Sequence, residues 1–314
     1  MNLTDRVAVC SRSFSKNPVL RSELLKKYSR VTFNDAGVQL SGDDLINFLR
    51  GHDLAITALE TIDDCLLSQL PELKAIGKYG VGLDMIDLGA MRKHGKRLGW
   101  MRGVNRRSVS ELTLAFAITM LRHVIAANRE VVGGTWRQHV GGQLTGRTLG
   151  IIGCGSVGQD LVRLLQPFEC KILVNDIVMY EDFYSHYHVK PVGLDELLNS
   201  SDIVTLHVPL DKSTRGMIGS EQLSQMKSGA FLINVARGGL VDEVALKNAL
   251  LHKVLAGAAF DVFNDEPPHD AELLALSNFL ATPHIGGSAE EAILAMGLAA
   301  IDGLSNATIP AEFN

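Results

Sequence analysis

Cysteine is scarce in this chain. Only four cysteines occur in 314 residues, at positions 10, 65, 154 and 170, and no two of them have C-x-x-C spacing. So few and so widely spaced cysteines argue against a disulfide framework and fit reduced thiols. We therefore predict a cytoplasmic protein. Cys154, which lies between two glycines, is predicted to be a small filler and not a nucleophile.

Long apolar runs and an excess of basic charge are also missing. The longest apolar stretch, from Leu112 to Leu121, is interrupted by Arg122 and His123 and is too short to span a bilayer. Residues 1–6 lead into a strand-like run without the apolar core of a signal peptide. Lys and Arg number 30 against 35 Asp and Glu, which argues against a nucleic-acid or anionic membrane partner. We predict a soluble protein with neither partner.

The length of the chain allows two domains with full hydrophobic cores. The first hundred residues alternate short apolar runs with helical patterns, and this alternation is typical of a parallel sheet covered by helices. The predicted strands are Val7–Cys10, Val31–Phe33, Leu54–Thr57, Leu73–Gly77 and Leu98–Met101. The predicted helices are Val19–Tyr28, Asp44–Leu49, Asp63–Leu70 and Asp87–His94.

A second strand-and-helix series begins near Thr148. Its predicted strands are Thr148–Ile152, Lys171–Asn175, Ile203–Leu206, Phe231–Asn234, Ala256–Phe260 and Phe279–Ala281. A long apolar helix, Val109–Ala127, should connect the two series, and a final helix, Ala289–Leu304, should return the chain to the first domain. We predict two doubly wound α/β domains with a cleft between them.

A glycine-rich loop opens the second series. The segment Gly150-Ile-Ile-Gly-Cys-Gly-Ser-Val-Gly158 follows an apolar strand and leads into a helix, which is the context that a dinucleotide-binding loop needs. Gly153 permits the tight turn, Gly155 lets the backbone approach a pyrophosphate, and Gly158 lets the helix pack on the strand. The first amides of the helix would then bind the phosphates. A glycine turn that serves packing alone is the alternative.

An acid follows the next predicted strand. Asp176 lies 18 residues after Gly158, where a carboxylate binds the hydroxyls of the adenosine ribose. Residues 177–182 contain no Lys or Arg to pair with a 2′-phosphate, and Asp176 would repel one. The sequence therefore predicts NAD and not NADP as the cofactor.

Polar or flexible residues follow one predicted strand after another in the second series. In open α/β sheets, ligands bind beyond the carboxyl ends of the strands, so these residues should converge on one crevice. They are Gly153, Asp176, His207, Arg237, Asp261 and His284.

Each reactive residue also has an interpretation in which it plays no catalytic role. Arg237 could be a surface residue, Glu266 a solvated turn acid, and His284 a cap of the final helix. His207 precedes Pro209 at a strand exit and is expected to shape a cofactor pocket without taking part in the chemistry. His186 and His188 lack nearby metal-ligand spacing, so we predict no metal site.

These motifs together resemble the D-isomer-specific 2-hydroxyacid dehydrogenases, most closely the phosphoglycerate dehydrogenase-like branch. The likeness covers nearly the whole chain from about residue 70. Besides the glycine loop, the matching stretches are Gly80-Val-Gly-Leu-Asp84, Asn105-Arg-Arg-Ser-Val-Ser-Glu-Leu112, Leu206-His-Val-Pro-Leu210, Ile233-Asn-Val-Ala-Arg-Gly-Gly239, Phe260-Asp-Val-Phe263 with Glu266-Pro267, and Thr282-Pro-His-Ile-Gly-Gly-Ser288.

The resemblance implies a catalytic trio. Arg237 resembles the residue that holds the substrate carboxylate, His284 the acid/base that exchanges a proton with the substrate oxygen, and Glu266 the partner that stabilises the imidazolium. The backbone of Gly80, Val81 and Gly82 resembles the loop that binds the same carboxylate.

The resemblance also implies the cofactor contacts. Asp261 would orient the nicotinamide carboxamide. The whole predicted cofactor set is Gly153, Gly155, Ser156, Val157, Gly158, Asp176, His207, Val235, Ala236, Arg237, Asp261, His284 and Gly286.

The chain departs from the family pattern at two points. Met85 stands where many members carry Asn. The segment Thr57–Thr61 contains no arginine for a substrate phosphate and includes the anionic Glu60.

We therefore predict an NAD-dependent dehydrogenase of small D-2-hydroxy acids that forms a homodimer. Residues 104–284 should form a Rossmann NAD-binding domain, inserted into a flavodoxin-like substrate domain of residues 1–103 and 285–314. D-3-phosphoglycerate dehydrogenase is the first alternative. An NAD(H)-sensing, corepressor-like binding protein is the alternative of another class.

Overall fold

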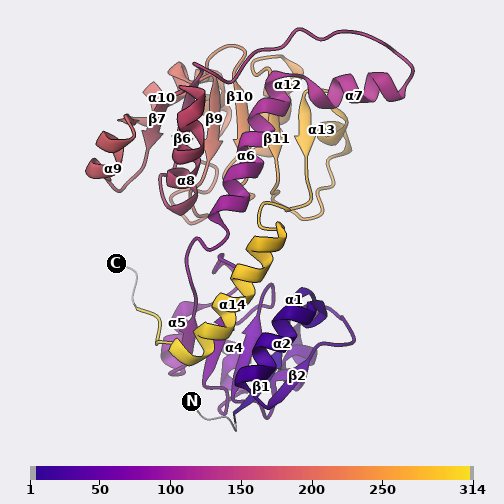
Figure 1. Ribbon diagram of the computed structural model, residues 1–314, viewed down its shortest axis with the longest axis vertical. Helices are drawn as coiled ribbons and strands as arrows, with labels where there is room; N and C mark the ends of the chain where they lie inside the picture. The colour runs from indigo at the N-terminus through magenta and orange to yellow at the C-terminus, as the bar shows by residue number, and fades with distance from the viewer. Residues whose placement is uncertain (1–4, 312–314) are drawn as a thin grey trace. The chain divides into compact units, whose positions relative to one another are not determined.

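The computed structural model describes residues 5–311 and contains two compact units (Figure 1). The first unit combines the residues up to Asn105 with those from Ala289 onward, and the second comprises Arg106–Ser288. Each unit has a parallel sheet of its own, so the predicted α/β class with two doubly wound sheets is confirmed.

The second unit is built on a seven-stranded parallel sheet with the order β12-β11-β10-β9-β6-β7-β8. This is the 3-2-1-4-5-6 order of dinucleotide-binding folds with one further strand at the edge. The four residues of β9 and of β10 are all buried, as expected for central strands with both faces covered. The strands are β6 (Thr148–Ile152), β7 (Lys171–Asn175), β8 (Lys190–Pro191), β9 (Ile203–Leu206), β10 (Phe231–Asn234), β11 (Gly257–Phe260) and β12 (Phe279–Ala281).

Two layers of helices cover this sheet, and α6 lies beside α8 on one of its faces (Figure 1). The other face packs on α10, α11 and α12. The helices of the second unit are α6 (Arg106–Leu121), α7 (Val124–Val132), α8 (Ser156–Leu165), α9 (Glu181–His186), α10 (Leu194–Ser200), α11 (Ser220–Gln225), α12 (Glu243–Leu251) and α13 (Ala271–Ala275), with a 3₁₀ turn at Gln166–Phe168.

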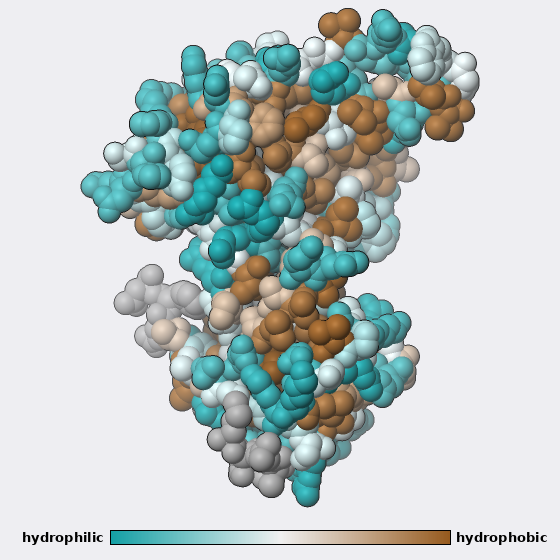
Figure 2. Space-filling model, in the orientation of Figure 1, coloured by the Kyte–Doolittle hydropathy of each residue, from teal (hydrophilic) through white to brown (hydrophobic). Residues whose placement is uncertain are grey.

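The prediction of a single helix over 109–127 is wrong, because the helix is interrupted at His123. This residue has φ 52°, and α6 and α7 are bent by 64° at the break. Among the described residues no single helix has the length and apolar character to cross a membrane; the bent α6–α7 pair meets that test by length and composition only. None of the α7 residues is buried, and Figure 2 shows hydrophobic residues among hydrophilic ones on the surface that α7 forms.

The first unit has a five-stranded parallel sheet with the order β2-β1-β3-β4-β5, which is the flavodoxin-like order. Alternate residues of the buried strands serve two cores, so Val7 and Val9 pack toward α2 and α14, while Ala8 packs toward α3, α4 and α5. The strands are β1 (Arg6–Val9), β2 (Arg30–Phe33), β3 (Leu54–Thr57), β4 (Ala75–Lys78) and β5 (Arg97–Gly99). The helices are α1 (Arg12–Lys16), α2 (Pro18–Lys27), α3 (Gly42–Leu49), α4 (Asp64–Ser68), α5 (Leu88–Lys93) and α14 (Glu290–Asn306).

The last helix, α14, crosses the first unit's sheet at very short range. A Cβ added to Gly99 would lie 2.2 Å from the carbonyl oxygen of Gly303, a distance that no side chain tolerates. Glycine at both positions therefore lets the helix backbone approach β5.

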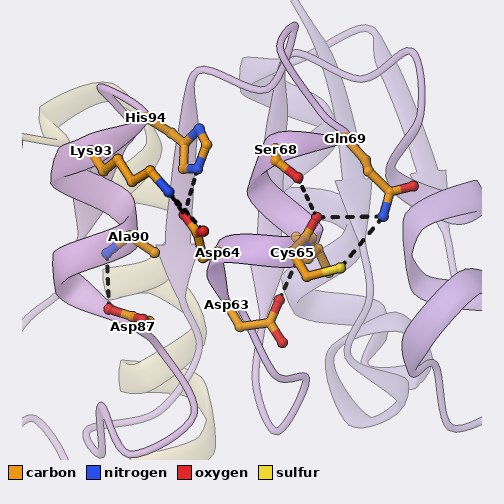
Figure 3. Close-up of polar contacts among 10 residues, drawn as sticks. Asp63, Asp64, Cys65, Ser68, Gln69, Asp87, Ala90, Lys93 and His94 are labelled. Carbon is orange, nitrogen blue, oxygen red and sulfur yellow. Dashed lines mark hydrogen bonds and ion pairs between the residues drawn. The ribbon is translucent and has the colours of Figure 1, made fainter.

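Aspartates cap the N-termini of two helices of the first unit and form hydrogen bonds between these helices (Figure 3). The Asp63 and Asp87 carboxylates accept hydrogen bonds from Leu66 N and Ala90 N, at 2.8 and 2.9 Å, and so cap α4 and α5. Asp64 accepts from Lys93 Nζ and from His94 Nε2, each at 2.8 Å, and these bonds connect the two helices.

Candidate active site

The glycine loop connects β6 to α8 and depends on its glycines at two close approaches. Gly153 has φ 94°, and a Cβ there would lie 2.8 Å from the carbonyl of His207. A Cβ on Gly158 would lie 2.2 Å from the carbonyl oxygen of Gly153. Gly155 is the N-cap of α8 and provides no side-chain cap, so the first amides of this ten-residue helix can donate to an anion.

Asp176 connects this loop to the end of the neighbouring strand β7. Its Oδ2 accepts a hydrogen bond from Cys154 N at 2.5 Å, and its Oδ1 accepts one from Val178 N at 2.8 Å. A carboxylate has about four acceptor sites, so Asp176 can still accept bonds from a diol. The neighbouring Ile177 and Met179 are exposed, at 103% and 59%, and this apolar surface beside Asp176 was not predicted from the sequence.

Two titratable groups near the loop are unsuited to nucleophilic or acid/base catalysis. Burial raises the pKa of the Cys154 thiol to about 12, so it stays protonated and is no nucleophile. Desolvation lowers the pKa of His207 to about 3, so its ring is neutral at physiological pH. The ring lies 3.0 Å from the Thr205 hydroxyl.

Arg237 follows β10 in a turn that Asn234 fixes. The Asn234 side chain donates to Arg237 O at 2.8 Å and accepts from Ala236 N at 3.1 Å, and Val235 is buried. A Cβ on Gly238 would lie 1.9 Å from the carbonyl oxygen of Phe263, so this turn lies directly against the segment that follows β11. The half-buried Arg237 side chain donates from Nη1 to Ala236 O at 2.7 Å.

His284 and Glu266 form a hydrogen-bonded pair. The distance from His284 Nδ1 to Glu266 Oε2 is 2.8 Å, and the two side chains are 49% and 40% exposed. The second carboxylate oxygen of Glu266 accepts from Phe263 N at 3.2 Å, so the acid is held on the backbone that also faces Gly238. α14 begins at Glu290 with Ala289 as its N-cap, and His284 therefore does not cap that helix.

Among the remaining predicted residues, Asp261 is 1% exposed and bonds to the turn around His284. Gly80, Val81 and Gly82 lie in the first unit, just after β4. Gly80 has φ 124°, and Val81 O accepts a hydrogen bond from Trp100 Nε1 at 3.0 Å. Within residues 5–311, no group of three or more His, Cys, Asp or Glu side chains is placed to hold a metal ion.

A buried cation that the sequence did not indicate lies near the predicted substrate segment. Lys78, the last residue of β4, is 5% exposed and is in register with Thr57 on β3. Its Nζ donates to the carbonyl of Ala58, and Glu60 folds back so that its carboxylate accepts from Ala58 N at 2.6 Å. Because strand pairing brings Lys78 to Thr57–Thr61, sequence distance conceals this contact.

The sheet order of the second unit, its glycine loop at the β6 exit and the acid at the β7 exit define an NAD-binding α/β domain. The family model for the NAD-binding domain of D-isomer specific 2-hydroxyacid dehydrogenases matches residues 114–286. The chain belongs to this family, which confirms the predicted membership and the predicted cofactor.

Three relatives illustrate the likeness. D-3-phosphoglycerate dehydrogenase of Bacillus subtilis is 37% identical over 77% of this chain and 46% of that protein. Hydroxypyruvate reductase of Thermotoga maritima is 34% identical over 84% of this chain and 87% of that protein. The crystal structure of D-lactate dehydrogenase from Aquifex aeolicus, complexed with NAD and lactic acid, has a TM-score of 0.84 and 28% identity over 95% of this chain and 93% of that one. The chain spans about half the length of the curated D-3-phosphoglycerate dehydrogenases that it matches.

Proposed function

We propose that this protein is an NAD-dependent oxidoreductase that interconverts a small 2-oxo acid and its D-2-hydroxy acid. The observation that carries the proposal is the His284–Glu266 pair at 2.8 Å, next to the turn of Arg237 and at the carboxyl ends of an NAD-binding sheet. Arginine, a histidine with a carboxylate partner, and a dinucleotide site are the groups that hydride transfer to a 2-oxo acid requires.

In the proposed mechanism, the cofactor supplies the hydride to C2 when bound. The Arg237 guanidinium holds the substrate carboxylate through paired N–H donors. As negative charge develops on the C2 oxygen, His284 donates a proton to it from the ring nitrogen that does not face Glu266. Glu266 stabilises the protonated ring before transfer and orients it through Nδ1. In the reverse direction His284 removes the hydroxyl proton.

The second unit has the residues that would bind NAD. The amides at the start of α8 would bind the pyrophosphate, Gly158 lets α8 pack against the loop, and Asp176 would accept from the ribose hydroxyls. We propose this unit as the NAD-binding domain and the first unit, with its Gly80–Gly82 loop, as the substrate domain.

We expect NADH to be used better than NADPH. A 2′-phosphate would meet the Asp176 carboxylate and would replace the 2′-hydroxyl that donates to it, which costs about 1–3 kcal/mol, or about 5- to 150-fold in kcat/KM. Steady-state kinetics with both cofactors at one 2-oxo acid concentration measure this ratio. The Asp176→Ser variant should reduce it, because serine removes the charge. Equal efficiency of the two cofactors in the parent enzyme would contradict the role of Asp176.

An unphosphorylated acid such as glyoxylate or hydroxypyruvate is the proposed substrate. The observations that support it are the position of Glu60 on the Thr57–Thr61 segment and the direction of Lys78 Nζ toward Ala58 O. We expect lower kcat/KM for 3-phosphohydroxypyruvate, because its phosphate would face the Glu60 carboxylate. Replacing Glu60 with Gln should raise kcat/KM for the phosphorylated compound by about fivefold, from about 1 kcal/mol of charge repulsion, and leave glyoxylate unaffected. A parent enzyme that prefers the phosphorylated compound would reverse this assignment.

D-3-phosphoglycerate dehydrogenase is the second candidate function. The observation that favours it is identity of 35–37% to three curated proteins of that name. The kinetic comparison of the phosphorylated and unphosphorylated acids separates the two candidates.

We also propose a homodimer formed through the exposed side of α7 and the segment that follows it. Val132, Trp136 and Val140 are 81%, 86% and 94% exposed there, and large exposed apolar groups of this kind mark interaction surfaces. Light scattering should give about twice the 34.0 kDa chain mass. The double variant Val132→Glu/Trp136→Glu should give the monomer mass, while Val244→Glu, at a 63% exposed position of α12, should not. A parent of monomer mass would contradict the proposal.

The cytoplasmic location remains a prediction, and the free state of all four cysteines supports it. Turnover of a 2-oxo acid panel, followed through NADH absorbance, tests the proposed activity against the corepressor-like alternative. A binding protein would retain NADH affinity and would reduce none of the acids. An enzyme would consume NADH with at least one of them.

A further inference from the structure

The turn that carries His284 has an uncommon backbone conformation. His284 has φ 54°, in the left-handed region that residues other than glycine rarely adopt. Its own N–H donates to the carbonyl oxygens of Asp261, at 2.9 Å, and Thr282, at 3.0 Å. Such conformations persist where the surrounding structure fixes them. Neighbouring groups must therefore hold this turn in place.

The Asp261 carboxylate collects three donors from the same turn. Its Oδ1 accepts from Thr282 Oγ1 at 2.5 Å and from Ile285 N at 2.7 Å, and its Oδ2 accepts from Gly286 N at 2.7 Å. Because Asp261 is 1% exposed, these charge-assisted bonds are shielded from water. A Cβ on Gly286 would lie 3.0 Å from Oδ2, which shows how closely the carboxylate fits the turn.

The C-terminal end of the turn is also bonded to helix α6. Ser108 Oγ donates to Gly286 O at 2.6 Å, so Gly286 is bonded through both its amide and its carbonyl. The Asp261 carboxylate thus bonds to residues on both sides of His284, to the Thr282 side chain before it and to the Ile285 and Gly286 amides after it. Glu266 instead contacts the imidazole ring at Nδ1. The two acids act on different parts of one residue.

We propose that Asp261 is a positioning residue for the acid/base step: its carboxylate fixes the left-handed turn and so directs the His284 imidazole toward Glu266 and the substrate oxygen. This inference rests on the proposed function of His284. It is separate from the predicted contact of Asp261 with the nicotinamide carboxamide. A carboxamide contact would affect the cofactor whether or not His284 is present, whereas a positioning residue acts only through His284.

The test begins with Asp261→Asn. The amide nitrogen of Asn cannot accept the bond from Gly286 N that Oδ2 accepts, so the turn loosens while the side-chain shape is kept. We expect kcat to fall by about 10- to 100-fold, the range for a misplaced catalytic group, with the Kd for NADH within about twofold of the parent. The KM for the 2-oxo acid should stay within about twofold of the parent, because Arg237 and its turn are untouched. A large loss of NADH affinity with kcat near that of the parent would overturn the proposal.

A double-mutant comparison separates the two roles more directly. In a His284→Ala background, adding Asp261→Asn should change the residual turnover by less than about twofold, since the residue through which Asp261 acts is gone. The same loss in both backgrounds would overturn the proposal. If His284→Ala alone keeps near-normal turnover, the proposed function fails instead, so the two failures are distinguishable.

Two further variants control for folding. Asp242 caps α12 by accepting from Val244 N and Ala245 N, each at 3.0 Å, so Asp242→Asn loses a comparable carboxylate away from the site and should keep kcat and the KM for the acid. If Asp261→Asn does not fold, Thr282→Val removes one donor to Asp261 while keeping the carboxylate. It should lower kcat by a smaller factor while the KM for the 2-oxo acid stays near that of the parent, and an unchanged kcat would count against the proposal.

Discussion

Replacing His284 with alanine is expected to lower the turnover number for 2-oxo acid reduction by about 10²–10⁴-fold, the usual contribution of a positioned acid/base. Hydride addition to the carbonyl leaves an alkoxide, which is costly unless a proton arrives in the same event. The Kd for NADH should stay close to that of the parent, because α8 and Asp176 are untouched. Stopped-flow turnover together with NADH fluorescence titration measures both quantities.

A matched histidine variant shows whether the effect belongs to this position. His252 lies exposed at the end of α12, where its backbone N–H donates to Asn248 O. His252→Ala should turn over like the parent. Near-normal turnover of His284→Ala would remove this residue from the mechanism, whatever the Glu266 contact looks like.

The second large effect is expected at Arg237. In the proposed mechanism, Arg237→Gln leaves the substrate carboxylate without its charged partner, which costs about 2–5 kcal/mol, or about 30- to 5,000-fold in kcat/KM for the 2-oxo acid. Most of the loss should appear as a higher KM for the acid. The kcat/KM of Arg237→Lys should lie between those of the parent and of Arg237→Gln, because lysine keeps the charge and loses the paired donors. Initial rates over a wide range of acid concentrations give the split.

Arg215 provides the control for this prediction. Its Nη1 lies 3.2 Å from the position that a Cβ on Gly239 would occupy, so it borders the same turn, and its side chain is exposed. Arg215→Gln should leave the KM for the acid within about twofold of the parent. An unchanged KM in Arg237→Gln would mean that another group holds the substrate carboxylate.

The sequence predicts central strands well because their signal is local. Thr148–Ile152, Ile203–Leu206 and Phe231–Asn234 are buried runs that end at a polar residue or a glycine, and the structure has them with the same bounds. Strands at the edge of a sheet are harder to predict from the sequence. β8 consists of the exposed Lys190–Pro191 alone and has no apolar run to reveal it. The strand predicted over Leu73–Gly77 lies at Ala75–Lys78, because Leu73 still belongs to the preceding turn through its N–H bond to Leu70 O.

Contacts made by tertiary structure are the part that the sequence conceals. The glycine loop, Asp176 and His284 could be proposed from the sequence because each belongs to a local motif with a known chemical purpose. The three bonds that Asp261 makes join residues 21 to 25 positions apart, and Lys78 reaches Ala58 across 20. No local pattern encodes such pairs, since they arise only when neighbouring parallel strands bring their exits together.

The turnover number for 2-oxo acid reduction in the parent and in Glu266→Gln tests the central claim, that His284 and Glu266 act as a pair, most directly. Glu266 Oε2 lies 2.8 Å from His284 Nδ1, so the glutamine variant keeps the shape of the side chain and loses the charged partner that orients the imidazole for proton transfer. We expect kcat to fall by about 10- to 100-fold with little change in the Kd for NADH. Equal turnover numbers of the two enzymes would show that the pair is not coupled and that Glu266 is only a turn acid.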